Sequence, residues 1–128
     1  GAGFVGSTAA ILIGLTAGAI CYLAIFLKEK LRYDDALDVV AVHGVGGLWG
    51  ALATGLFASA GATGLFFGNP RQLWVQLVAA LSAMAYSALA TSAILLALKH
   101  TVGLRVTEEE ELQGLDLSLH DETGYSIN

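Results

Sequence analysis

Residues 34–50 read DDALDVVAVHGVGGLWG, and this stretch decides how the chain folds. A histidine, His43, stands inside an uncharged apolar run that begins after Asp38. An ionisable ring is costly to bury in lipid, so it is expected to face other protein or a polar path. The small residues that follow are expected to let neighbouring helices approach closely; they are Gly44, Gly46, Gly47 and Gly50.

The composition is that of a membrane protein. The chain has 128 residues, of which 55% are hydrophobic and only 13% are charged, whereas soluble domains carry about 25% charged residues. The charges are also segregated, because residues 1–27, 39–70 and 72–98 contain none. A helix of about 20 apolar residues crosses a bilayer core of about 30 Å. We therefore expect three transmembrane helices, over residues 4–27, 37–58 and 72–98.

An acidic tail follows the last apolar stretch. Residues 106–128 contain seven acidic and no basic side chains, while residues 1–105 contain six basic and four acidic ones. The predicted fold is thus an all-α membrane protein, with a transmembrane part over residues 1–105 and a polar tail over residues 106–128. Thr107 and Glu110 are spaced as a capping box, which predicts a helix of about two turns. Gly114 is expected to end that helix, and the rest is expected to be extended or irregular.

The distribution of basic residues predicts the orientation, because they gather on the cytoplasmic side of membrane proteins. In a three-span topology only Arg71 lies on one side, and five basic residues lie on the other. We therefore expect the start of the chain outside and the tail in the cytoplasm. Residues 1–27 lack the basic start of a signal peptide, and their apolar stretch is too long for one. Since the chain begins with Gly and enters membrane-type sequence at once, we expect a piece of a larger protein, or a trimmed product.

His43 is the candidate functional residue. In a regular helix it shares a face with Val39, Gly46 or Gly47, Gly50 and Thr54. Neutral imidazole both donates and accepts hydrogen bonds and titrates near physiological pH, which suits a relay for a proton or a small polar molecule. Ammonia, being neutral, would cross a dry apolar path more easily than ammonium. The alternative is that His43 only hydrogen-bonds a neighbouring helix.

Asp38 is expected to cap the first turn of the same helix, where backbone N–H groups lack partners, and to shape the inner mouth of a path. Metal binding is not expected, because His43 has no second His, Cys or acid on its face. Phosphate-binding, nucleophile-elbow and zinc-protease motifs are all lacking. We therefore expect no enzymatic activity, no cofactor and no nucleic-acid partner.

Three segments carry a resemblance to a known family. Residues 34–58, DDALDVVAVHGVGGLWGALATGLFA, resemble a signature of the ammonium transporter family (Amt/Mep/Rh), in its Amt branch. Residues 102–125 are similar to the cytoplasmic C-terminal region of that family, and residues 1–24 to the helix before the signature. The resemblance implies a homotrimer whose subunits each have eleven transmembrane helices in two inverted halves. This chain would be the last three helices and the tail.

The same resemblance implies roles for individual residues. His43 would be the second of two pore histidines that relay a proton while ammonia passes, and Val39 would line the inner part of the path. The tail would pack across neighbouring subunits and help receive a PII-type nitrogen-signalling protein. The expected location is a bacterial inner (plasma) membrane. The tail residues assigned to regulation are Arg105, Glu108, Glu109, Glu110 and Glu111.

Two other functions remain open. The chain could be an ammonium-sensing membrane module that signals through its tail, which predicts binding without flux. It could also be a helix bundle in which His43 is an axial cofactor ligand. The partner histidine and the outer gate residues that the family implies would belong to earlier helices.

Overall fold

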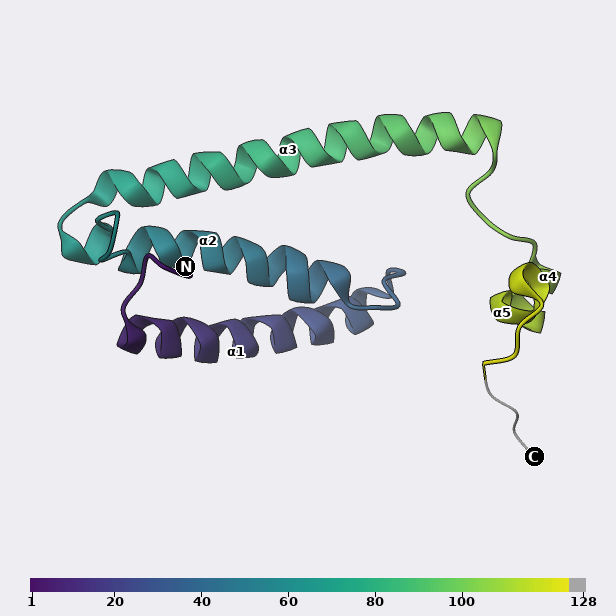
Figure 1. Ribbon diagram of the computed structural model, residues 1–128, viewed down its shortest axis with the longest axis horizontal. Coiled ribbons are helices and arrows are strands. Elements are labelled where there is room, and N and C mark those ends of the chain that lie inside the picture. The colour runs from purple at the N-terminus through teal and green to yellow at the C-terminus, as the bar shows by residue number, and fades with distance from the viewer. Residues whose placement is uncertain (125–128) are drawn as a thin grey trace. The chain divides into compact units, whose positions relative to one another are not determined.

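A computed structural model describes residues 1–124, and nearly all regular structure in this range is helical. Contacts group the chain into two units, Gly1–Tyr86 and Ser87–Asn128, with the division inside the longest helix. Figure 1 shows the order of the elements along the chain. They are α1 (Ser7–Leu31), the π-helix η1 (Val40–Val45), α2 (Gly46–Phe57), the short 3-10 helix η2 (Leu65–Phe67), α3 (Pro70–Thr101), α4 (Glu108–Gln113) and α5 (Leu115–His120).

Three helical segments are long and apolar enough to cross a membrane, as predicted. They are Ser7–Leu31, the continuous run of η1 and α2 over Val40–Phe57, and Pro70–Thr101. Large apolar side chains on these segments are exposed, and the buried apolar residues of the described chain are limited to Ala41, Ala53 and Ala58. A folded segment with so little interior of its own is one whose apolar faces meet lipid or other helices.

The ends of the first and third spans differ from the prediction by a few residues. α1 starts later than residue 4, because Phe4 and Val5 pair with the residues just after α2 through an isolated bridge and backbone hydrogen bonds. It continues to Leu31 and carries Lys28 and Lys30 in its last turn, where cations interact favourably with the helix dipole. α3 starts at Pro70, a residue that suits the first position of a helix because it has no N–H to leave unpaired.

α1 and the η1–α2 segment lie side by side in the first unit (Figure 1). The Trp49 indole N–H donates to the Ile13 carbonyl at 3.3 Å, and the Cys21 sulfur lies 3.8 Å from the Val42 carbonyl oxygen. The helices therefore meet along their lengths through backbone carbonyls and small side chains, as membrane helices tend to do.

The tail confirms one prediction and corrects another. Thr107 and Glu110 form the expected capping box, and α4 ends just before Gly114. The prediction of irregular structure after Gly114 is wrong, since α5 covers Leu115–His120. The Ser118 hydroxyl donates to the Glu110 carbonyl at 3.4 Å, so contacts with α4 support this short helix. The last residues of the predicted irregular stretch, 125–128, lie outside the described range.

Candidate functional site

His43 lies in the middle of η1 and is exposed. Ala41, in the same segment, is only 1% exposed, whereas Val39 is 47% exposed. The imidazole has no hydrogen-bond partner among residues 1–124. His43 and Val39 are therefore both on parts of this segment that the described chain leaves uncovered, with the ring available to groups from elsewhere.

The π-helical turn was not predicted. π-helices form i→i+5 hydrogen bonds, are rare, and occur mostly as single turns, frequently at functional sites. A wider turn rotates the residues after it relative to a regular α-helix, so the predicted single face from Val39 to Thr54 is not continuous. Thr54 donates its hydroxyl back to the Gly50 carbonyl at 2.8 Å and is occupied within its own helix.

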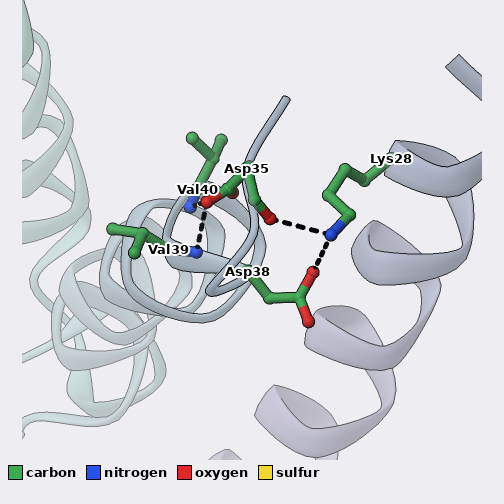
Figure 2. A network of polar contacts seen from close by, with 5 residues as sticks. All are labelled: Lys28, Asp35, Asp38, Val39 and Val40. Carbon is green, nitrogen blue, oxygen red and sulfur yellow. Dashed lines mark hydrogen bonds and ion pairs between the residues drawn. The ribbon is translucent and has the colours of Figure 1, made fainter. Parts of the chain in front are cut away.

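The prediction that the Asp38 side chain caps this helix is wrong. The cap is Asp35, whose two carboxylate oxygens accept hydrogen bonds from the Val39 and Val40 N–H groups, each at 2.9 Å (Figure 2). Asp38 stands at the helix start with a left-handed backbone, φ 55°. Its carboxylate instead pairs with the ammonium of Lys28. The geometry differs because the Asp38 carboxylate pairs with an opposite charge from α1, while Asp35 accepts from the first N–H groups of the helix.

Lys28 connects α1 with the start of η1. Its ammonium donates to the Asp35 carbonyl at 2.9 Å and pairs with the Asp38 carboxylate (Figure 2). The Lys28 side chain is only 16% exposed. The predicted first span, residues 4–27, ended just before Lys28, and Asp35 was given no role, although residues 28–38 contain seven charged side chains.

One of the four predicted packing glycines meets a neighbouring helix within residues 1–124. A β-carbon at Gly46 would lie 2.9 Å from the Cys21 sulfur, whereas Gly47 and Gly50 have nothing within 4 Å and Gly44 meets only Val40 of its own segment. Gly55, which was not singled out from the sequence, is also closely packed. Its β-carbon would lie 2.9 Å from the Leu73 Cα, so the start of α3 approaches α2 at this point.

The predicted regulatory residues lie at the start of the tail. Glu108, Glu109, Glu110 and Glu111 form the first turn of α4, where carboxylates interact favourably with the helix dipole. The hydrogen bond from the Thr107 backbone N–H lowers the pKa of Glu110, and the Thr107 hydroxyl adds to this effect. Arg105 and Glu111 line a shallow hollow together with Leu104, Val106 and Leu115.

These features define a class of protein, an integral membrane protein of apolar helices with an exposed histidine in a π-helical turn. Residues 1–125 match the model of the Ammonium Transporter Family. The chain belongs to this family, whose members are membrane transporters.

Relatives and solved structures agree with this family. Ammonium transporter Amt1 of Archaeoglobus fulgidus is 48% identical over 98% of this chain and 33% of the relative. An ammonium transporter of Bacillus subtilis is 47% identical over 97% of this chain and 32% of the relative. The crystal structure of Saccharomyces cerevisiae Mep2 is 35% identical with a TM-score of 0.76, covering 84% of this chain and 27% of that one. The chain thus spans about a third of the length of the curated relatives it matches.

Proposed function

We propose that this chain is the C-terminal portion of a protein that transports ammonium or ammonia across a membrane, and that His43 lines the path. The observation that carries the proposal is the exposed imidazole on an otherwise uncharged span, which finds no hydrogen-bond partner in the described part of the chain. Ionisable residues at such depth are usually functional and usually face a partner or a cavity. The names of the relatives, ammonium transporters, supply the substrate.

The imidazole suits this substrate because it handles protons in a dry path. Ammonium is costly to strip of water, while neutral ammonia is not. A ring that donates from one nitrogen and accepts at the other passes a proton between neighbours without carrying a lasting charge. His43 would share this task with a second histidine from the rest of the protein, and Val39 would keep the adjacent wall apolar.

The proposal also covers the assembly of the parent protein, its orientation in the membrane and the contacts of the tail. The parent protein would be a homotrimer of eleven-helix subunits in a bacterial inner membrane, with the start of this chain outside and the tail in the cytoplasm. Arg105 and the α4 acids would contact neighbouring subunits or a PII-type protein. The five basic residues on the tail side support this orientation. Asp38, next to the Lys28 ammonium, would belong to the inner mouth.

The test is His43→Ala in the full-length protein, reconstituted into vesicles. We expect an altered ammonium-driven pH change or current, because the relay loses its ring, at unchanged yield of assembled protein. Arg71→Gln is the control, since Arg71 belongs to the start of α3 and not to η1. Unaltered flux and current in His43→Ala would make His43 structural. Ligand-dependent binding at the tail without flux would instead favour a sensor.

A further inference from the structure

We propose that Lys28 is a positioning residue for His43: through Asp38 and the Asp35 backbone it fixes the start of the π-helical turn that carries the imidazole. This inference rests on the proposed function, because position matters only if the ring meets a substrate or a proton. It adds Lys28 and Asp35, to which the proposed function gives no role, and it assigns α1 a part in the geometry of the site.

Lys28 connects α1 to the segment before η1. Lys28 is in the last turn of α1, and its ammonium makes both the Asp35 carbonyl hydrogen bond and the Asp38 ion pair. The Lys28 and Asp38 side chains are 16% and 32% exposed. Removing one member of a pair that is partly shielded from water leaves the other charge without its partner. The pair therefore specifies one arrangement of the two segments.

The backbone conformation of Asp38 is held in place by its surroundings. Its φ of 55° is uncommon for a residue with a side chain, and such conformations persist where the surroundings over-determine them. Lys28 supplies part of that constraint by holding the carboxylate. The Asp38 carbonyl in turn accepts from the Val42 N–H at 2.8 Å, so Asp38 connects directly to the residue before His43.

Asp35 caps the start of the helix that carries His43. The carboxylate of Asp35 bonds two successive N–H groups, those of Val39 and Val40, which fixes where the helix begins. Lys28 holds the carbonyl of the same residue at 2.9 Å. One lysine thus reaches both the capping residue and the left-handed residue that follows (Figure 2).

These contacts exclude an alternative winding of the segment as a continuous α-helix. If the segment wound as a continuous α-helix, one residue of slippage would rotate the side chains by about 100°. The far end of the π-turn is held by the close approach of Gly46 to the Cys21 sulfur. The near end is held by Lys28. A turn that is fixed at both ends keeps the imidazole at one height and one rotation.

The experiment compares variants of the full-length protein in vesicles, each corrected for assembled protein. We expect Lys28→Met to lower the transport rate by about tenfold or more, since small misplacements of a reacting group have effects of this order. Lys28→Arg should retain most of the rate, because it keeps the charge and a donor. Lys30→Met is the matched control: it removes the same charge from the same helix end, at an exposed position.

A second readout separates positioning from stability. With the His43 ring labelled with ¹⁵N, Lys28→Met should change its magnetic resonance signals, while Lys30→Met should not. Where Lys28→Met does not assemble, Asp38→Asn, which keeps side-chain size, takes its place with the same expected shift. Unchanged ring signals and a rate equal to that of Lys30→Met would overturn the inference, as would a Lys28→Arg variant as impaired as Lys28→Met. If His43→Ala itself transported normally, the proposed function would fail instead.

Discussion

The sulfur of Cys21 lies 2.9 Å from the place a β-carbon would occupy at Gly46. α1 and the histidine-bearing segment are therefore as close as their backbones and this one side chain allow. Such contacts are typical of membrane helices, which associate by close packing of small residues and not by excluding water from between them.

We predict that Gly46→Ala destabilises the protein by about 1–3 kcal/mol, the usual effect of an extra methyl group in a packed interface. Cys21→Ala removes the atom that the methyl group would meet, so the double variant should recover most of the loss. The measurement is a double-mutant cycle of unfolding free energies in detergent. Additive effects of the two substitutions would show that the sulfur is not the obstacle.

Gly55→Ala should be more harmful than Gly46→Ala. Its methyl group would meet the Leu73 Cα, which is backbone and cannot rotate away. A compensating truncation is therefore not available, and Leu73→Ala should not restore stability in the double variant. The comparison uses the same unfolding measurement; full recovery by Leu73→Ala would contradict a backbone contact.

The left-handed backbone of Asp38 gives a further prediction. Asp38→Ala and Asp38→Gly both remove the carboxylate that pairs with Lys28, but only glycine adopts a positive φ without steric cost. With φ at 55°, Asp38→Gly should be more stable than Asp38→Ala by about 1 kcal/mol. Thermal unfolding of the two variants provides the measurement. Equal midpoints would show that the variants relax to another backbone conformation.

The capping box of the tail should depend on pH. The Thr107 N–H donates to the Glu110 carboxylate at 2.8 Å, and this bond lowers the pKa of Glu110 below its ordinary value of 4.5. The contribution of the box to α4 is therefore complete above pH 4.5 and is lost as the pH falls through the lower pKa of the folded state.

The measurement is the chemical shift of the Thr107 amide proton during acidification of the assembled protein. We expect a midpoint below 4.5, and no midpoint in Glu110→Gln, which keeps an acceptor oxygen but does not titrate. A midpoint at or above that value would mean that the folded state does not favour the ionised carboxylate.

The sequence predicts the three spans well because their lengths follow from the thickness of a bilayer and from where the charges stop. It predicts their ends less well. Lys28 and Lys30 are charged but belong to α1, since long basic side chains place their ammonium groups beyond the apolar part of a helix. In the tail, leucines at every second position of residues 115–119 suggest a strand-like period, yet contacts with α4 produce a helix.

The candidate site could be predicted only in part. An isolated histidine in an uncharged span is visible in the sequence, as is a group of acids before it. Which acid caps the helix is not visible, because the choice depends on Lys28, ten residues before Asp38. The π-turn is likewise set by contacts at both of its ends. Local spacing does not contain this information.

The length of α3 has a consequence for the surroundings of the protein. At 1.5 Å per residue, its 32 residues extend for about 48 Å, well beyond a hydrocarbon layer of about 30 Å. The surplus is accommodated by inclination, by projection beyond the acyl chains, or by a locally thicker bilayer. We expect Lys99 and His100, in the last turn, to lie near the phosphate headgroups at a depth that varies with acyl-chain length. The depth of this helix in the membrane therefore depends on lipid composition as well as on its own residues.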